Sequence, residues 1–377
     1  MIRDAFGLIY AGEQIINLRE LVESRAVGAL PIAGRYRVID FALSNMVNSG
    51  IRTVAIAANR NYNSLMDHLA SGKSWDLSRK SDGLFLLTPY ANRDNQGISR
   101  GMIDALKNSL GFIRRSKEQY CILTGSYTVF NRTYDDMMKS HVESGADITI
   151  LYNRMAADHS GGDGDRFEDV RIKLAKNGVV TNIEINPGLS SLGCMSMDVY
   201  IIRKEVLIYL VEECFAKGEH HFVDNLLRGN LDRLKIMGFE HTGYVGRMHS
   251  VAAYYKANMD LLDADLQRSL FRSRNRIYTK VKDEVPAKYI CDSKVSNSIV
   301  ANGCIIEGEV RNSVIFRGVY IGKGTVVKNS IVLPNVEIND NAELENVILD
   351  KDVSVRNRSR LIGNPAFPVV IRKGAMV

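Results

Sequence analysis

The chain has 377 residues, more than one compact core usually carries, so we expect two domains. Its hydrophobic content of 45% and charged content of 24% are those of an ordinary globular chain and exclude a largely disordered or collagen-like protein. The net charge is only +6, and no stretch approaches the roughly 18 consecutive apolar residues of a membrane-spanning helix.

Two segments are locally basic. Residues 24–66 hold five arginines and one acid, and residues 266–288 hold seven basic residues and two acids. Separate basic zones suit small phosphorylated anions better than nucleic acid, which favours a continuous basic stripe. Ordinary solvated surface is an equally weighted alternative for the second zone.

The cysteines and the N-terminal residues predict a cytoplasmic protein. The first ten residues do not have the pattern of a secretory signal. Five cysteines without CxxC spacing are interpreted as buried thiols rather than as disulfides or metal ligands. They are Cys121, Cys194, Cys214, Cys291 and Cys304.

Strand-like and helix-like patterns alternate in the first part of the chain. Helices are expected from residue 37, at 65–70 and at 134–144, the last with Thr133 as its N-terminal cap. The alternation indicates βαβ units around a mainly parallel sheet, so residues 1–262 are predicted to form a Rossmann-like α/β domain. Strands are expected at 5–10, 53–58, 120–124 and 146–152.

A repeat follows, with a spacing of 15 and then 17 residues. Asn-Ser-Ile-Val at 297–300 returns in similar form at 312–315, 329–332 and 346–349. Aliphatic residues about every six positions, with Gly and Asn between them, are typical of a three-sided parallel β-helix of roughly 18 residues per coil. We therefore expect a linker at 263–288, a β-helix at 289–377, and stacking of coils between chains.

The β-helix contains no histidine, because all seven histidines precede residue 250. Acyltransferases built on such coils need a histidine as general base. The domain is therefore interpreted as structural or regulatory.

Several long motifs resemble those of bacterial glucose-1-phosphate adenylyltransferases. They are GRYRVIDFALSN at 34–45, NSGI at 48–51, HLASG at 68–72, WDL at 75–77 and ANMDLL at 257–262. The resemblance covers nearly the whole chain and implies a nucleotidyltransferase domain followed by a left-handed β-helix. It also implies a reaction in which ATP and glucose 1-phosphate give ADP-glucose and pyrophosphate with Mg²⁺.

The residues that carry this chemistry in the family are replaced here. The family's Gly-rich loop, whose backbone N–H groups and arginine hold a triphosphate, corresponds to residues 12–18, GEQIINL. A phosphate-binding lysine, two Mg²⁺-binding aspartates and a sugar-phosphate lysine are also missing. The altered positions are Glu13, Ile15, Asn17, Val27, Ser126, Asn186 and Arg247.

These changes resemble the non-catalytic GlgD-type subunit. The resemblance implies no metal site or cofactor in this chain, Mg²⁺ in a catalytic adenylyltransferase partner that the chain activates, and a homo- or hetero-tetramer. One alternative is a working nucleotidyltransferase whose metal ligands have moved to Asp104, Asp198 or Asp224. Another is an effector-binding protein without a catalytic partner.

An anion site for a phosphorylated effector is expected near the junction of the domains. The resemblance implies Arg25, Arg35 and Arg37 as its residues, with Arg372 or Lys373 as a last contact. Guanidinium groups suit phosphate well. The alternative is that Arg35 and Arg37 brace the turn against Asp40 or the β-helix. Arg247 could act as a built-in cation, and His68 and Trp75 are expected to pack.

Overall fold

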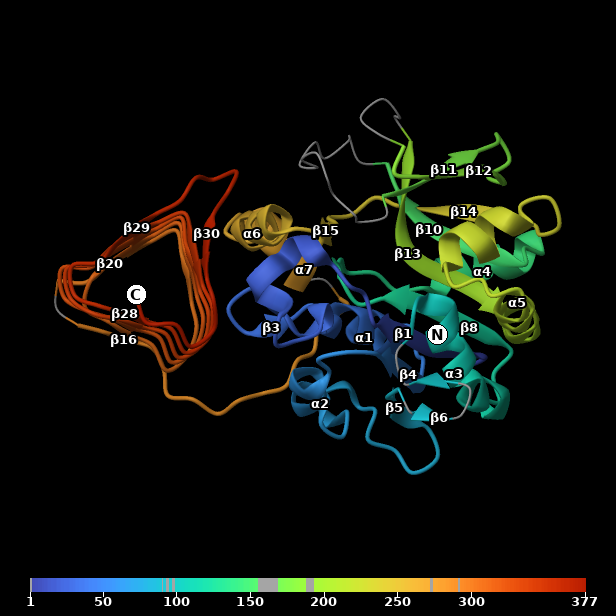
Figure 1. The fold of residues 1–377 in the computed structure, drawn as a ribbon, viewed down its shortest axis with the longest axis horizontal. Helices are drawn as coiled ribbons and strands as arrows, with labels where there is room; N and C mark the ends of the chain where they lie inside the picture. The colour runs from blue at the N-terminus through green and yellow to red at the C-terminus, as the bar shows by residue number, and fades with distance from the viewer. Residues whose placement is uncertain are drawn as a thin grey trace.

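The computed structural model describes residues 2–89, 91–92, 95–96, 99–154, 169–187, 193–271, 274–290 and 292–377. They form an α/β domain and a triangular solenoid beside it, joined by a long connection (Figure 1). None of the described helices is long and apolar enough to cross a bilayer.

The first domain is built on a nine-stranded mixed sheet with the order β12-β11-β13-β8-β1-β4-β5, on which β10 pairs with β13 and β14. Strands β8, β1, β4 and β5 run parallel, whereas β13 is antiparallel to β8 and to β10. The strands are β1 (Ala5–Ala11), β4 (Thr53–Ala58), β5 (Gly83–Leu87), β8 (Tyr120–Gly125), β10 (Ile148–Asn153), β11 (Val170–Leu174), β12 (Val180–Ile185), β13 (Cys194–Arg203) and β14 (Ile236–His241).

Helices cover both faces of this sheet, and an apolar core lies on each face. The helices are α1 (Ile39–Asn48), α2 (Asn63–Leu69), α3 (Met102–Arg115), α4 (Asp135–Ser144), α5 (Lys204–Ala216), α6 (Val251–Asp260) and α7 (Ala264–Phe271). Short helical turns are η1 (Ile16–Val22), η2 (Val27–Ala29), η3 (Lys73–Trp75), η4 (Phe222–Leu227) and η5 (Arg228–Asn230). Two-stranded pairs are β2 (Pro31–Ile32) with β3 (Tyr36–Arg37), β6 (Ala91–Asn92) with β7 (Asn95–Gln96), and β9 (Thr128–Val129) with β15 (Gly246–Arg247).

The second domain is the left-handed parallel β-helix that the repeat predicts. Its first side is β16 (Lys288–Tyr289), β19 (Ile305–Ile306), β22 (Tyr320–Ile321), β25 (Glu337–Ile338) and β28 (Ser354–Val355). Its second side is β17 (Lys294–Ser296), β20 (Glu309–Arg311), β23 (Val326–Lys328), β26 (Glu343–Glu345) and β29 (Arg360–Ile362). Its third side is β18 (Ile299–Val300), β21 (Val314–Ile315), β24 (Ile331–Val332), β27 (Val347–Leu349) and β30 (Val369–Ile371).

Asparagines turn the chain at the corners of the solenoid. Asn297, Asn312, Asn329 and Asn346 all have positive φ angles between 41° and 54°, which Asn tolerates better than most residues. Because they recur at one corner, successive coils stack in register. Aliphatic side chains from all three sides fill the interior.

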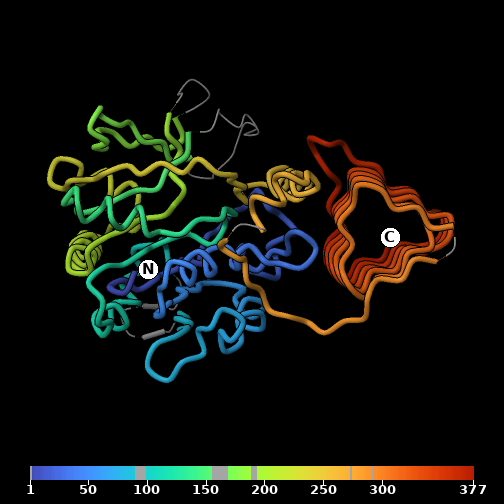
Figure 2. Tube along the Cα trace, turned by 180° about the vertical axis from the view of Figure 1, so that it is seen from behind, coloured from blue at the N-terminus to red at the C-terminus, as the bar shows by residue number. Residues whose placement is uncertain are grey.

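The third side of the solenoid faces the first domain and shares a continuous apolar core with it. Val314, Ile331 and Ile348 pack in one cluster with Phe41 and Tyr254. The connection between the domains runs along one edge of this junction (Figure 2). The stretch expected as a linker at 263–288 begins with helix α7, whose Leu270 is buried, and β16 starts at Lys288.

Two local expectations are corrected by the structure. The N-terminal cap of helix α4 is Tyr134, whose side chain makes no capping hydrogen bond, so Thr133 is not its cap. Cys121, Cys214 and Cys304 are buried free thiols, whereas Cys194 is only partly buried. Cys291 lies outside the described residues.

Candidate functional site

Two of the altered positions bond to each other at the carboxyl ends of β1 and β8. The two strands are parallel neighbours, with Tyr10 opposite Gly125, so the segments that follow them meet. The Glu13 carboxylate accepts hydrogen bonds from the Ser126 backbone N–H at 2.6 Å and from Ser126 Oγ at 2.8 Å. We call this pair the Glu13–Ser126 clasp.

The clasp is an unusual setting for a carboxylate. Burial raises the pKa of Glu13 to about 7, and the nearby Asp198 adds to this effect, while the hydrogen bonds from Ser126 oppose it. The first-strand loop is thereby fastened to the end of β8. A ligand that needs this space must displace the clasp.

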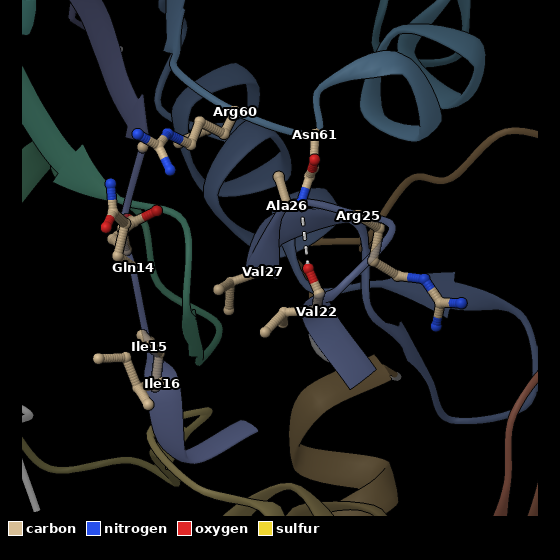
Figure 3. A pocket seen from close by; sticks show the side chains of 12 residues that line it. Gln14, Ile15, Ile16, Val22, Arg25, Ala26, Val27, Arg60 and Asn61 are labelled. Atoms are coloured by element: carbon tan, nitrogen blue, oxygen red, sulfur yellow. Dashed lines mark hydrogen bonds between the residues drawn. The ribbon is translucent and has the colours of Figure 1, made fainter. Parts of the chain in front are cut away.

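A pocket lined in part by Glu13 lies beside the clasp. Ile15 and Val27 are among the residues that line this pocket, and both side chains are buried. They are the apolar residues that the sequence analysis expects in place of a glycine and a lysine of the family pattern. Figure 3 shows Gln14 and Arg60 near one end of the pocket and Arg25 directed away from them. Asn61 holds the far wall in place because its amide donates to the Val22 carbonyl oxygen at 3.2 Å. Asn17, on η1, is not among the residues that line it.

Arg247 is the residue that the sequence analysis expects at the position of a metal-binding aspartate. Strand β15 carries it against β9, and its side chain is only 8% exposed. Its guanidinium lies 3.6 Å from Asp169 Oδ1, 2.8 Å from Met195 Sδ and 3.4 Å from Tyr127 Oη. Burial acts to lower the pKa of Arg247, but Tyr127, Asp198 and Asp169 outweigh it and the pKa is raised. A fixed cation therefore lies where the family pattern puts a carboxylate.

Asn186 takes part in the same set of contacts. It has a positive φ of 51°, and its side-chain oxygen accepts the Asp169 N–H at 2.8 Å. In return, the Asn186 N–H donates to the Asp169 carbonyl oxygen at 2.8 Å. Asn186 thus holds Asp169, the acid that pairs with Arg247.

The three alternative carboxylates do not gather at one place. Asp198 accepts hydrogen bonds from the hydroxyls of Tyr127 and Tyr200. Asp104 accepts from the Arg100 N–H and bonds His220 Nδ1, and Asp224 pairs with Arg228. No group of three or more metal-ligating side chains occurs in the part of the chain that the structure describes.

The four arginines expected at an anion site have different surroundings. Arg25 is buried and forms a two-pronged ion pair with Asp350 of the β-helix, at 2.9 and 2.8 Å. Arg37 donates to Ser64 Oγ at 3.0 Å, and only its backbone N–H bonds Asp40. Arg35 is exposed above the Tyr36 ring, and Arg372 is exposed without a side-chain hydrogen bond or ion pair among the described residues.

Behind Arg37, the two motif residues expected to pack do so. His68 Nε2 lies 2.5 Å from Asp40 Oδ1, and the edge of its ring meets buried Trp75. Burial lowers the pKa of His68. Asp40 therefore links the Arg37 backbone to this histidine.

The junction nevertheless gathers cations around Arg37. Burial, together with Arg37, Arg25 and Arg317, lowers the pKa of Lys351 to about 7. Burial and the neighbouring Arg317 and Arg37 also lower the pKa of Lys282. Burial lowers the pKa of Arg37 to about 10, and Arg25 and Arg317 add to that. We call Arg37, Lys282, Arg317 and Lys351 the junction cluster.

Two members of this cluster, Arg317 and Lys351, can be found from the repeat in the sequence, although they are not among the residues expected at the anion site. Arg317 and Lys351 each stand two residues after the end of a third-side strand, at Ile315 and Leu349. Equivalent positions of a solenoid repeat lie at the same corner. Aligning the coils by position therefore places both cations at one corner.

Comparisons with known proteins agree with this architecture. Residues 7–263 match the nucleotidyl transferase family model, and residues 285–366 match that of the GlmU-like C-terminal hexapeptide region. The chain is 37% identical to the glycogen biosynthesis protein GlgD of Bacillus subtilis over 95% of its length and 92% of the relative. It is 38% identical to the GlgD protein of Geobacillus stearothermophilus over 85% and 82%. A glucose-1-phosphate adenylyltransferase of Clostridium perfringens is 30% identical over 89% and 86%.

Proposed function

The chain belongs to the nucleotidyl transferase family and, within it, to the branch of the glycogen biosynthesis proteins GlgD, and from that premise we propose that it is a non-catalytic regulatory subunit. In this proposal it acts in the cytoplasm in glycogen biosynthesis. It pairs with a catalytic glucose-1-phosphate adenylyltransferase, activates it, and assembles with it as a tetramer.

The observation that carries the proposal is the Glu13–Ser126 clasp. Adenylyl transfer depends on positioning phosphates and neutralising their charge, with Mg²⁺ bridging phosphate oxygens. The clasp puts a carboxylate where the family's loop receives a triphosphate, and Ile15 and Val27 supply no charge to offset it.

The metal position supports the same conclusion. Mg²⁺ is usually held through one or two carboxylates with octahedral geometry. Ser126 is committed to Glu13, and Arg247 is a buried cation beside Asp169. These residues do not fit a metal ion, so in this proposal Mg²⁺ is bound by the catalytic partner.

The test is a comparison of initial rates of ADP-glucose synthesis by this chain alone, by a catalytic homologue alone, and by the two together. We expect the chain alone to be silent and the mixture to exceed the homologue several-fold. An unrelated β-helix protein in place of this chain is the control. Turnover by the chain alone would overturn the proposal and favour the relocated-ligand enzyme, and an unaltered rate in the mixture would overturn the regulatory role.

We place the anion site for a phosphorylated effector at the junction cluster. Its support is the gathering of partly buried cations. Burial lowers the pKa values of Lys282 and Lys351, and the charges of their neighbours lower them further. An anion would relieve that repulsion. Arg25 is committed to Asp350 and is left out of this site.

Inorganic phosphate is the probe for this site. We expect phosphate to change the rate of the mixture, and the Arg317→Ala, Lys351→Ala double variant to remove that response. Lys176→Ala, at an exposed lysine in the turn between β11 and β12, is the matched control and should keep the response. A response that survives in the double variant, or no response in the wild type, would exclude the site.

A further inference from the structure

The pocket beside the Glu13–Ser126 clasp is walled mainly by apolar side chains. Its apolar lining residues are Ala11, Ile15, Ile16, Val22, Ala26 and Val27. Most of this wall is buried in the protein, but Ile16 is 63% exposed. Ligand pockets are typically lined by apolar side chains with a few polar groups that orient the ligand. This pocket therefore offers apolar surface that a ligand can remove from water.

One cation in the pocket is available to a ligand. Among the described residues that line the pocket, Glu13, Arg25 and Arg60 are charged. Arg25 is held by Asp350 in an ion pair at 2.8 Å. Arg60 is exposed and makes no side-chain hydrogen bond or ion pair with the residues that the structure describes. An anionic group that enters the pocket therefore meets Arg60.

An amide side chain lies at the same end of the pocket as this cation. Figure 3 shows Gln14 and Arg60 there, apart from the apolar side chains of Ile15, Ile16 and Val27. A guanidinium group offers N–H donors in a fork that matches the two oxygens of a carboxylate, and a glutamine amide can donate as well. The pocket is thus polar at one end and apolar along its wall.

The backbone that carries Arg60 is fixed without a ligand. The next residue, Asn61, has a positive φ of 53°, and its amide donates to the carbonyl oxygens of Val22 and Glu23 at 3.2 and 3.0 Å. The Ala26 N–H in turn donates to the Asn61 carbonyl oxygen at 3.1 Å. Because these segments form one wall before binding, little backbone entropy is lost when a ligand binds.

The charges of the pocket select a ligand with a single negative charge. A phosphate monoester carries close to two charges at neutral pH, and one guanidinium neutralises only one of them. The ionised Glu13 carboxylate in the same pocket repels the remaining charge. The apolar wall, for its part, requires a hydrocarbon body. A carboxylate on a hydrocarbon body meets both conditions.

We propose that this pocket binds a small amphipathic monocarboxylate, with the carboxylate at Arg60 and Gln14 and the hydrocarbon body against the apolar wall. The site goes beyond the proposed function and does not depend on it. It also lies apart from the junction cluster, none of whose members lines the pocket. Because Arg25 belongs to the same wall and holds Asp350 of the β-helix, a bound ligand stabilises a segment that joins the two domains.

The test is titration calorimetry of the full-length chain with hexanoate and hydrocinnamate, an aliphatic and an aromatic monocarboxylate. Arg60→Met removes the cation and keeps an apolar stem, and Arg52→Met makes the same change at an exposed arginine before the opposite end of β4. We expect at least about tenfold weaker binding to Arg60→Met and unchanged binding to Arg52→Met. Both arginines are exposed, so neither change should disturb the fold, which circular dichroism checks.

The apolar wall is tested in the same way. Ile16→Gln should weaken binding of both probes, whereas Val142→Gln, at a residue of α4 that is 54% exposed, should not. Hexanamide, which has the body without the charge, should bind far more weakly than hexanoate.

Four results would overturn the proposal. They are no binding of either probe to the wild type, equal binding of hexanamide, equal effects within either pair of variants, and displacement of hexanoate by orthophosphate. The last would show that the pocket takes inorganic anions. These titrations use the chain alone, so their outcome is independent of the rate comparison that tests the regulatory role.

Discussion

Glu13 and Ser126, two of the positions expected to be altered, bond to each other. The clasp uses both the backbone N–H and the hydroxyl of Ser126 to hold one carboxylate. An aspartate at 126 would set a second carboxylate against Glu13 in a partly buried place, where like charges repel strongly. Ser126→Asp alone, with Glu13 kept, should therefore lower the stability of the fold relative to the wild type.

The first prediction concerns Glu13→Gln. Because the folded-state pKa of Glu13 is raised from 4.5 to about 7, ionised Glu13 weakens folding, and the free energy of unfolding falls as the pH rises from 4.5 to 7. Glutamine can still bond both Ser126 groups but does not ionise. The variant should be more stable than the wild type at pH 8 and lose this advantage near pH 5, as measured by urea unfolding. A variant that is less stable at pH 8 would contradict this account.

The second prediction concerns Lys351 in the junction cluster. Its pKa of about 7 means that it loses its charge between about pH 6 and pH 8, so the positive charge of the cluster falls over this range. Sulfate stays a dianion over this range, so its affinity measured by calorimetry should fall as the pH rises. Lys351→Met should bind sulfate weakly and with little pH dependence, while Lys176→Met should behave as the wild type.

Two buried histidines, His141 and His241, lie in the layer formed by α4, β10 and β14. His141 Nδ1 lies 2.8 Å from Thr149 Oγ1, and His241 ends β14 beside Phe130. The Nε2 atoms of both histidines are buried without a hydrogen-bond partner among the described residues. Protonation would leave an unpaired charge in each place.

The third prediction is therefore acid sensitivity of this layer. Burial, with Arg203 and Arg132 as further causes, lowers the pKa values of His141 and His241 to about 4. Their contribution to folding is complete above pH 6.5 and is lost as the pH falls toward 4, at up to about 1.4 kcal/mol per pH unit for each histidine. The double variant His141→Gln, His241→Gln should show a shallower decline of unfolding free energy in acid. His221→Gln, at an exposed histidine, should keep the wild-type slope.

The sequence predicts the elements that depend on a local period. The strand expected at 53–58 coincides with β4, and the repeat at 297–349 becomes the third side of the solenoid. The helix expected at 134–144 is α4, but its cap is wrong because Thr133 lies outside the first turn. A pattern within one helix or strand thus predicts that element, whereas the residue that caps its end depends on contacts with neighbouring segments.

The contacts within the candidate site could not be predicted from the sequence. Glu13 and Ser126 are each identifiable as altered, but their contact requires β1 and β8 to be neighbours in the sheet. Arg25 and its partner Asp350 are 325 residues apart, and no pattern within either segment joins them. Contacts between distant segments are set by the topology and the docking of domains.

For the molecule as a whole, the two domains share a core, so they should unfold together. The Arg25–Asp350 pair lies within this junction, with side chains 2% and 1% exposed. Tyr255 adds a hydrogen bond from its hydroxyl to the Asn329 carbonyl oxygen at 2.6 Å. The junction is thus fastened by polar contacts as well as by apolar packing.

The fourth prediction tests that coupling. Asp350→Asn leaves the Arg25 charge buried without its partner and should lower the free energy of unfolding by about 3–5 kcal/mol. Calorimetry should then resolve two transitions in place of one. The double variant Arg25→Met, Asp350→Leu removes both charges and should regain much of the loss. A single transition with unchanged stability in Asp350→Asn would show that the pair does not couple the domains.

The third side of the solenoid has one more consequence. Five successive coils contribute Ile299, Val314, Ile331, Ile348 and Val370 to the core shared with the first domain, and Asp350 meets Arg25 from the fourth. Repeat proteins ordinarily gain or lose whole repeats at little penalty, because each repeat touches only its neighbours. Here the removal of one 17-residue coil would shift every later contact out of place. The first domain therefore fixes the number of coils, and length changes that keep the fold should be confined to the corner between the first and second sides, which lies away from it (Figure 1).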